Sequence, residues 1–351
     1  MVNSFQIGPR GIGPGQPCYI IAEAGVNHDG SLATAHKLID AAVEAGADAV
    51  KFQTWITERL CAPGARKAEY QSHNSPDDID QFEMLKRLEL PYEWHEELMA
   101  HALDKGIDFL STPDEIQSAE FLCQIGVPLL KIGSAELTNH LFLSQIARLG
   151  KPVILSTGMG NFAEIEAAIK VIDSENEIPL AFLHCVSAYP SPESEMNLRC
   201  IGEMRHRFQL PIGLSDHTTG FVAAVVATGI GMDILEKHLT LDKSAIGPDH
   251  AASANPSEFS EMVRFVRRAE AMLGDGVKKM APSEFGTKAA VRRSLFFKED
   301  LAKGQRVKIE HLEALRTDCP GIEAEDLLRV IGQSLAKTKK RGEQMQYSDF
   351  E

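Results

Sequence analysis

The sequence predicts a (β/α)8 barrel followed by a small C-terminal domain, and three observations support this prediction. Short β-rich segments alternate with helical patterns from Tyr19 to about Leu273, as in βαβ units around a parallel sheet. Eight such segments occur. The stretch that they span has the roughly 250 residues typical of this barrel.

Each of the eight predicted strands has small or polar residues at or next to its end. The strands are Tyr19–Gly25, Asp48–Thr54, Asp108–Thr112, Pro128–Ser134, Pro152–Gly158, Leu180–Val186, Pro211–Asp216 and Asp233–Leu239. In such a barrel the C-terminal ends of the strands and the loops after them form the active face. The polar endings therefore predict a site at the barrel mouth.

The segments around the strands fit this architecture. Between the first two strands, apolar residues from Leu32 to Ala42 recur on one helical stripe, and Gly46 ends the helix. The opening Phe5–Pro17 contains prolines and precedes the first strand. We therefore expect it to form a hairpin over the barrel bottom rather than a dinucleotide-binding loop.

The pattern changes after Gly274. Residues 274–293 are charged, contain Gly and Pro and lack periodicity, which is typical of a linker. Short apolar runs then alternate with turns to the C-terminus. We expect a barrel domain at residues 1–280, and a linker with a small capping domain at residues 281–351.

Composition narrows the function classes. The chain has 351 residues, 44% hydrophobic and 25% charged, which is typical of a folded protein. Its formal net charge of −14 argues against a general nucleic-acid surface. No apolar run is long enough to span a membrane, and the N-terminus lacks a secretory layout, so we expect a cytoplasmic protein without membrane contact. The scattered cysteines predict free thiols. They are Cys18, Cys61, Cys123, Cys185, Cys200 and Cys319.

Charged residues at the strand ends predict an anion site. Glu23 lies on an otherwise apolar first strand, where a carboxylate is costly unless it has partners. Lys51 and Lys131 end the second and fourth strands, so two ammonium groups should converge and require an anion between them. Phosphate or carboxylate oxygens would fit there. Hydroxyl donors for the remaining acceptor sites are Thr112, Ser134, Ser156 and Ser215.

Two histidines predict a metal site. His217 follows the seventh strand and His238 ends the eighth, so neighbouring strands present two imidazoles side by side. Either histidine alone would more often be a structural hydrogen-bonding residue. As a pair without thiolates to complete a closed zinc site, they leave positions open for substrate oxygens. Near them, Tyr189 offers a hydroxyl and Asp249 a carboxylate to a substrate, while His184 on an apolar strand is interpreted as structural.

These segments together resemble the sialic acid synthase family. The motifs occur in the order AEAGVNHDGS, AVKFQT, STPDE, LLKIGSAELTN, ILSTGM, LHCVSAYPSP, GLSDHT, LEKHLTLD and GPDHAAS. The tail from about Arg293 resembles the antifreeze-like (SAF) module that follows the barrel in these enzymes. The resemblance spans nearly the whole chain.

The resemblance implies an enzyme that condenses phosphoenolpyruvate with N-acetylmannosamine and water, giving a nine-carbon 2-keto acid and phosphate. Mn2+ or Mg2+ would be bound by His217 and His238. Phosphoenolpyruvate would be held by Lys51, Lys131, Thr112, Ser134, Ser156 and Ser215. The sugar would be held by Glu23, Gln53, Tyr189, Asp249 and Arg316. Of these residues, the catalytic groups would be Glu23, Lys51 and Lys131. The resemblance also implies a domain-swapped homodimer, in which Arg316 reaches the N-acetyl group in the partner's barrel.

Three segments differ from the family pattern and leave the sugar open. Ser187 stands where several bacterial members have Asn, Ser253–Pro256 is SANP, and the segment that begins at Arg316 is RTDCPGI. The alternatives are the diacetamido precursors of legionaminic acid or pseudaminic acid. Other candidates are a condensation with a phosphorylated sugar, which would require an arginine cluster, a metal-dependent hydrolase, and a non-catalytic carbohydrate-binding or ice-binding protein.

Overall fold

The computed structural model describes residues 4–75 and 78–351. It divides the chain into two compact units, one ending at Gly274 and the other spanning Asp275–Glu351. The sequence placed the boundary a few residues later, between 280 and 281, inside the predicted linker. Among the described residues, no helix is long and apolar enough to cross a membrane.

The first unit is built on eight parallel strands, and each predicted strand is found. They are β3 (Tyr19–Gly25), β4 (Ala49–Thr54), β5 (Asp108–Pro113), β6 (Leu130–Ile132), β7 (Val153–Ser156), β8 (Leu180–Cys185), β9 (Ile212–Asp216) and β10 (Ile234–His238). The hydrogen-bonded order runs from β5 through β4, β3, β10, β9, β8 and β7 to β6. The first and last barrel strands in the chain, β3 and β10, pair in parallel. At the ends of the hydrogen-bonded order, β5 packs beside β6, so the sheet is a nearly closed barrel.

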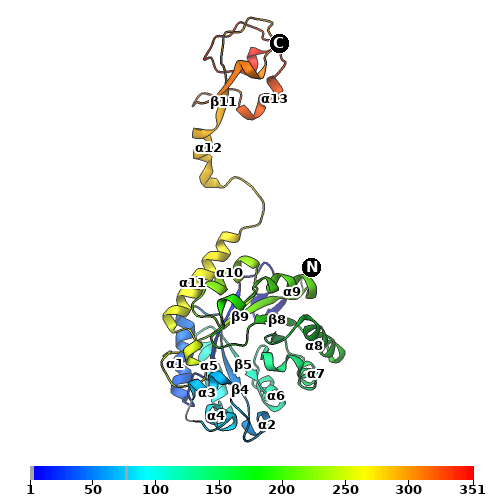
Figure 1. Cartoon of the computed structure of the whole chain (residues 1–351), viewed down its shortest axis with the longest axis vertical. Coiled ribbons are helices and arrows are strands. Elements are labelled where there is room, and N and C mark those ends of the chain that lie inside the picture. Colours follow the sequence, from blue (N-terminus) through cyan, green and yellow to red (C-terminus); the bar gives the residue numbers. More distant parts are fainter. Residues whose placement is uncertain (1–3, 76–77) are drawn as a thin grey trace. The chain divides into compact units, whose positions relative to one another are not determined.

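Helices surround these strands (Figure 1). They are α1 (Leu32–Glu44), α2 (Thr57–Leu60), α3 (Glu69–Asn74), α4 (Gln81–Leu88), α5 (Tyr92–Asp104), α6 (Ile116–Ile125), α7 (His140–Arg148), α8 (Phe162–Glu175), α9 (Arg199–Phe208), α10 (Val222–Ile230) and α11 (Pro256–Leu273). The predicted first helix is confirmed as α1, and the Ser31 side chain caps it by accepting from Thr34 N. The short helices α2, α3 and α4 are an insertion between β4 and α5 that the sequence patterns did not predict.

The lead-in hairpin is confirmed. Strands β1 (Phe5–Ile7) and β2 (Arg10–Ile12) pair antiparallel, and Ile7 and Ile12 are buried. They pack against the inward apolar residues of the barrel strands, among them Tyr19 and Ile21. The hairpin therefore closes the bottom of the barrel.

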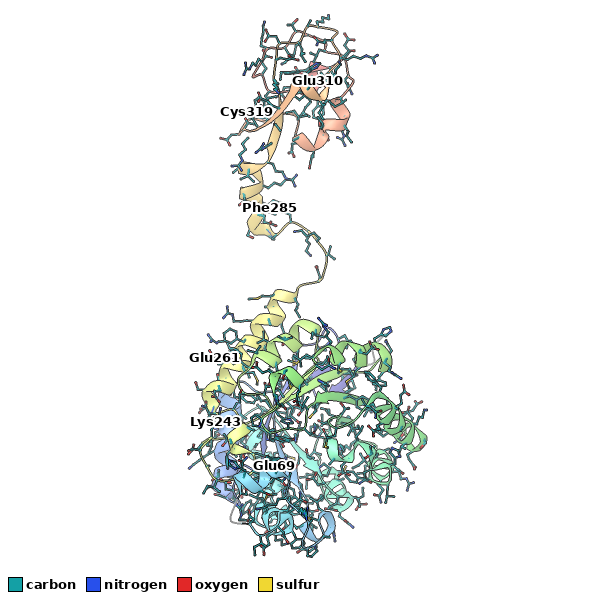
Figure 2. The ribbon with its side chains drawn as sticks, in the orientation of Figure 1. Glu69, Lys243, Glu261, Phe285, Glu310 and Cys319 are labelled. Atoms are coloured by element: carbon teal, nitrogen blue, oxygen red, sulfur yellow. The ribbon has the colours of Figure 1, made fainter. Side chains whose placement is uncertain are left out.

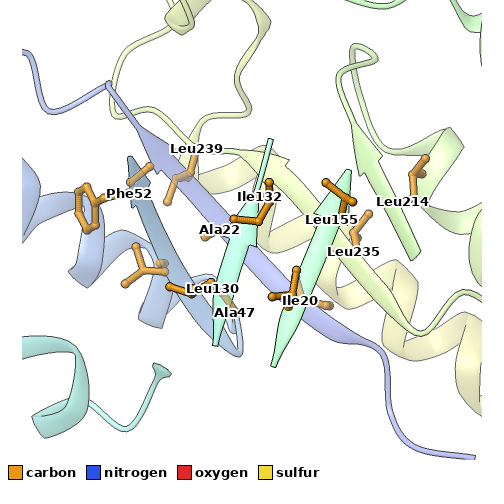
Figure 3. Packing of buried hydrophobic residues seen from close by; sticks show 14 of the residues in the cluster. Ile20, Ala22, Ala47, Phe52, Leu130, Ile132, Leu155, Leu214, Leu235 and Leu239 are labelled. Carbon is orange, nitrogen blue, oxygen red and sulfur yellow. The ribbon is translucent and has the colours of Figure 1, made fainter. Parts of the chain in front are cut away.

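Successive side chains alternate between the inside and the outside of the barrel. On β3, Ile20 and Ala22 pack outward in the large cluster shared with the helices. Figure 3 shows outward residues of several strands, among them Ile20 and Ala22 on β3, Ile132 on β6 and Leu155 on β7. The intervening residue Ile21 packs inward. The two-residue period of the strand therefore determines which residues face the barrel axis.

The second unit has its own small core. It contains α12 (Phe285–Val291), β11 (Arg293–Phe297), β12 (Leu312–Arg316) and α13 (Leu327–Val330), and β11 pairs antiparallel with β12. Phe297 and Leu335 are fully buried in a separate apolar cluster. Cys319 is exposed on this unit (Figure 2). All six cysteines are free thiols, as predicted.

Candidate active site

A cavity of about 500 Å³ opens at the C-terminal ends of the barrel strands, and every barrel residue predicted for the site lines it. These residues are Glu23, Lys51, Gln53, Thr112, Lys131, Ser134, Ser156, Tyr189, Ser215, His217, His238 and Asp249. They come from all eight strands or from the segments just after them. The polar endings of the strands therefore do meet in one place.

Strand register explains this convergence. Ile21 packs in the inward apolar layer, and Glu23, two residues later, lines the cavity. Ile154 and Ser156 repeat the relation on β7. Because inward positions recur every two residues, most strands present an apolar side chain at the bottom and a polar one at the mouth.

Lys51 is the centre of the charged cluster. Its Nζ lies 2.8 Å from Glu23 Oε2 and donates to Thr112 Oγ1 at 2.7 Å. Gln53 Nε2 donates to the other Glu23 oxygen at 2.9 Å. Burial raises the pKa of the Glu23 carboxyl to about 7, an effect that Lys51 only partly offsets. Glu23 is therefore poised to change charge near neutral pH.

Glu236 links the two predicted lysines and was missed by the sequence analysis. Its carboxylate lies 3.6 Å from Lys51 Nζ and 3.5 Å from Lys131 Nζ, and Ser215 Oγ donates to it at 3.0 Å. Burial opposes its charge, but the two lysines outweigh burial and lower the pKa of Glu236 to about 2. Burial lowers the pKa of Lys131. The expected convergence of ammonium groups occurs, with a protein carboxylate between them.

The hydroxyls are unequally engaged. Ser134 Oγ accepts from Gly158 N at 3.0 Å. A Cβ at Gly158 would clash with the Ser187 and Ser134 hydroxyls, so a larger residue there would displace these side chains. Ser156 Oγ is buried and has no hydrogen-bond partner among the described residues. A buried hydroxyl without a partner is costly, and an anionic ligand would satisfy it.

The two predicted metal ligands lie side by side, with ring centroids 5.3 Å apart. His217 Nδ1 lies 2.9 Å from the Val186 carbonyl oxygen. Because a carbonyl oxygen can only accept a hydrogen bond, Nδ1 carries the proton, and the lone pair of Nε2 is left to bind a cation. His238 Nδ1 is buried and makes no hydrogen bond within the described chain, and it lies 3.5 Å from Asp249 Oδ2. Two bare imidazole nitrogens beside a carboxylate fit a divalent cation.

No group of three or more His, Cys, Asp or Glu in residues 4–75 and 78–351 is arranged as a metal cage. A pair of histidines at an open cavity is the arrangement that the sequence predicted. Burial raises the pKa of Asp249 to about 6, because the carboxylate is removed from water, although His217 and His250 pull it down.

Aromatic rings connect the histidines to the inserted helices. The Tyr189 ring lies 4.2 Å from the His217 ring, and the Tyr70 ring stacks on Tyr189 at 4.9 Å. Tyr70 belongs to α3, which begins at Glu69 (Figure 2). Asn74 Nδ2 at the other end of α3 donates to the Pro248 carbonyl at 2.9 Å. The inserted segment thus forms one wall of the cavity.

Several neighbouring polar residues brace the site from outside. Asn27 Nδ2 donates to the Leu239 carbonyl and to Ser253 Oγ. His250 lies between Thr240 Oγ1 and Asp29 Oδ1. His28, Thr54 and His184 also lie outside the lining of the cavity. His184 Nε2 lies 2.6 Å from the Met196 carbonyl, the structural role that was expected.

Arg316 lies in the second unit, exposed at the end of β12 and paired with Arg293 in the strand register. The lining residues that the sequence analysis did not assign to the site include Asp114, Cys185, Ser187, Tyr70 and Gln71 of α3, and Gln81, Met84, Leu85 and Leu88 of α4. Strand period could have found Glu236, since it lies two residues before His238. It could also have found Cys185, two residues after the inward Leu183.

Comparison with known proteins identifies the family. The NeuB family profile matches residues 38–278, more than half of the chain. The chain belongs to the NeuB family. The SAF domain profile matches residues 292–351, so the predicted C-terminal module is confirmed. This NeuB-family chain is an enzyme of the phosphoenolpyruvate-dependent sugar-acid synthase class, as the sequence predicted, and such synthases are in general metal-dependent.

Individual relatives are similar in sequence to this chain over nearly their whole length. The N,N'-diacetyllegionaminic acid synthase of Legionella pneumophila is 42% identical over 349 residues, covering 98% of this chain and 97% of the relative. The human N-acetylneuraminate-9-phosphate synthase is 34% identical, covering 94% and 91%. The crystal structure of the N-acetylneuraminic acid (sialic acid) synthetase of Leptospira borgpetersenii in complex with citrate has a TM-score of 0.73 and 32% identity, covering 83% of this chain and 98% of that one.

Proposed function

We propose that this enzyme condenses phosphoenolpyruvate with an open-chain N-acetylated sugar and water, releasing phosphate and a nine-carbon 2-keto acid. The observation that supports this most directly is the meeting, in one cavity, of a buried two-lysine cluster and a bare histidine pair. The lysines suit an anionic substrate, and the histidines suit activation of a carbonyl.

Phosphoenolpyruvate would occupy the lysine side of the cavity. Lys51 and Lys131 would interact with its phosphate and carboxylate, and the unpartnered Ser156 hydroxyl would donate to an anionic oxygen. Since the pKa of Glu23 is about 7, the cluster of Lys51, Lys131, Glu23 and Glu236 is partly positive at neutral pH. A dianion bound there meets a favourable local charge despite the net charge of −14 on the chain.

His217 and His238 would hold a divalent cation, Mn2+ or Mg2+. A bound cation supplies Lewis-acid polarisation of the sugar aldehyde. His217 has a fixed tautomer, because its Nδ1–H donates a hydrogen bond to the Val186 carbonyl. Tyr189, whose ring lies against His217, would orient the sugar beside the histidines together with Gln53 and Asp249.

The chemistry forms one C–C bond and breaks one C–O bond. C3 of phosphoenolpyruvate attacks the aldehyde carbon, and the aldehyde oxygen takes a proton to become a hydroxyl. Water adds to the positive C2 and loses a proton, and phosphate leaves C2 with the electron pair of its C–O bond. The new C2 hydroxyl then passes its proton to the phosphate and becomes the keto group. Lys51 and Lys131 stabilise the departing charge in a site already organised around it. Glu23 would orient the sugar or accept a proton.

The sugar has two leading candidates. N-Acetylmannosamine is the first. The second is the diacetamido precursor of legionaminic acid, which is favoured by the 42% identity to a synthase of that product. A pseudaminic-type precursor is a third alternative. Phosphate release from phosphoenolpyruvate with each sugar, with and without EDTA, tests the proposal. Metal-dependent release with at least one N-acetylated sugar is expected, and none with any of them refutes it.

We propose further that the SAF unit completes the site in a domain-swapped homodimer, with Arg316 of one chain at the sugar of the other. Arg316 is exposed on its own unit and available to a partner. Deleting residues 290–351 should leave a folded barrel, since the first unit has its own core, with turnover reduced by about 10-fold or more. Turnover and circular dichroism of the truncated chain, beside an Arg316→Ala variant, test this. Full activity in both variants contradicts it.

We also propose that the enzyme works in the cytoplasm. The support is chemical: six free cysteines, of which Cys319 is exposed, suit a reducing compartment. Fractionation of the native cell with a thiol-labelling assay checks it.

A further inference from the structure

The inserted helix α4 turns one complete stripe of its surface toward the cavity. Gln81, Met84, Leu85 and Leu88 all line it, and their spacing of i, i+3, i+4 and i+7 places them on one helical face. None of these residues belongs to the charged cluster or the histidine pair. The helix therefore adds a separate surface, which we call the α4 wall: Gln81, Met84, Leu85 and Leu88.

The α4 wall has a firm apolar base. Met84 and Leu88 are each 1% exposed and pack with Val26 and Trp55 in a small cluster of their own. Leu85 packs at the edge of this cluster and is only half-buried. A half-buried leucine on a rigid base, next to a polar cavity, is a contact surface for an apolar group.

Amide groups lie beside this apolar base. Gln81 Nε2 donates to Gln71 Oε1, and Gln71 Nε2 donates to the Tyr70 hydroxyl, both at 3.4 Å. Hydrogen bonds of this length are weak, so a ligand can replace them at little cost. The cavity therefore offers amide donors and acceptors within reach of Leu85.

A chain of ring and hydrogen-bond contacts separates the histidines from Gln71, which is hydrogen-bonded to Gln81 of the α4 wall. From His217, the Tyr189 ring is the first contact and the Tyr70 ring the second, and the Tyr70 hydroxyl accepts from the Gln71 amide. A sugar whose reacting carbon lies at the histidines would reach this wall with its distal carbons if it follows the Tyr189 and Tyr70 rings.

We propose that the α4 wall, with Gln71, binds an acetamido group on the half of the sugar away from the reacting carbon. Its methyl would contact Leu85 and Met84, and its amide would pair with Gln71 and Gln81. A hydroxyl at the same carbon would leave the apolar base against a polar group and the amides without a match. This inference rests on the proposed function and selects a diacetamido sugar as its substrate.

The test compares two sugars that differ only in this group: 2,4-diacetamido-2,4,6-trideoxymannose and 6-deoxy-N-acetylmannosamine. The native enzyme should prefer the diacetamido sugar by about 10-fold or more in kcat/KM. Leu85→Asn should remove most of this preference by raising KM for the diacetamido sugar. Leu85→Met, which keeps an apolar contact, should restore it.

Leu141→Asn is the matched control, because Leu141 is 73% exposed on α7 and outside the described lining of the cavity. It should keep the native preference. The inference is overturned if the native enzyme does not distinguish the two sugars, or if Leu85→Asn lowers kcat/KM equally for both. Absence of turnover with every N-acetylated sugar overturns the proposed function itself, a result distinct from turnover without preference.

Discussion

The interior of the barrel has two layers that share the same strands and differ in everything else. At the bottom, Ile21 and Ile234 pack with the lead-in hairpin. At the mouth, two residues further along the same strands, Glu23 and Glu236 lie in the charged cluster. Both layers are almost completely buried. Position along the strand, rather than burial, separates the stabilising residues from the chemical ones.

The difference between the layers is energetic. Each fully buried aliphatic side chain of the bottom layer stabilises the fold by about 1.5–3 kcal/mol. Buried charges do the reverse, because desolvation costs at least as much as the ion pairs return. In the mouth layer, Lys51 and Lys131 form ion pairs with Glu236. The cost of burying these charges is offset by the apolar packing of the bottom layer and of the outer helices. Substitutions should therefore act on stability below and on turnover above.

The largest effect on turnover is expected at the histidine pair. His238→Ala removes one of the two imidazoles that fit a divalent cation, so metal-dependent turnover should fall by about 1,000-fold, the equivalent of several kcal/mol of transition-state stabilisation. Because His238 Nδ1 has no hydrogen-bond partner among the described residues, folding should hardly change. Phosphate release against Mn2+ concentration and thermal unfolding measure the two effects.

His140→Ala is the control, since His140 is an exposed residue at the start of α7. It should retain native turnover and native metal dependence. If His238→Ala kept native turnover as well, the pair would not be a metal site, and the histidines would be structural after all.

A sharper comparison uses two residues of one strand. On β7, Ile154 belongs to the bottom layer and Ser156 to the mouth. Ile154→Ala should lower the free energy of unfolding by about 2–5 kcal/mol through the cavity that it leaves. Ser156→Ala removes a buried hydroxyl that lacks a described partner, so it should be neutral or slightly stabilising, yet raise KM for phosphoenolpyruvate about 10-fold.

Urea unfolding and initial rates of phosphate release, both below the unfolding transition, separate the two results. The opposite outcome, with Ser156→Ala strongly destabilised and its KM unchanged, would mean that Ser156 serves the fold. In that case the boundary between the two layers lies higher on β7 than we have drawn it.

The strands and most of the site were predictable because they depend on local pattern. Apolar runs that end in Glu23, Lys51 or His238 are visible in the sequence, and parallel strands must bring their ends to one edge. The same rule of alternation, applied backwards from His238, would have revealed Glu236 as an inward residue. It was missed because Glu236, Lys237 and His238 are three polar residues in a row, so polarity alone does not show which of them face the barrel axis.

The inserted helices could not be predicted in the same way. In residues 55–75 and 78–91 the helices α2, α3 and α4 have four, six and eight residues, so their periodicity is too brief to detect. Their position depends on tertiary contacts: the Tyr70–Tyr189 stack and the hydrogen bond from Asn74 to the Pro248 carbonyl. Such contacts join residues more than a hundred positions apart and leave no local signal.

The smallest expected effect tests the charge balance of the mouth layer. The pKa of Glu23 is raised to about 7, mainly by burial, so the carboxyl is neutral below this pH and negative above it. As pH rises through 7, the lysine cluster loses net positive charge and should bind an anion less well. We expect KM for phosphoenolpyruvate to rise about 5-fold from pH 6 to pH 8, the effect of roughly 1 kcal/mol from one charge at short range.

Glu23→Gln is neutral at every pH, so it isolates this contribution from the titration of phosphoenolpyruvate itself. The variant should lack the rise in KM, whatever it loses in kcat through its contact with Gln53. An identical pH profile in both proteins would assign the rise in KM to phosphoenolpyruvate itself or to Asp114, whose pKa burial raises to about 7. Glu236 would not replace it, because two lysines hold its pKa at about 2 and keep it charged throughout this range. Glu23 would then keep a single charge state between pH 6 and pH 8, as Glu236 does.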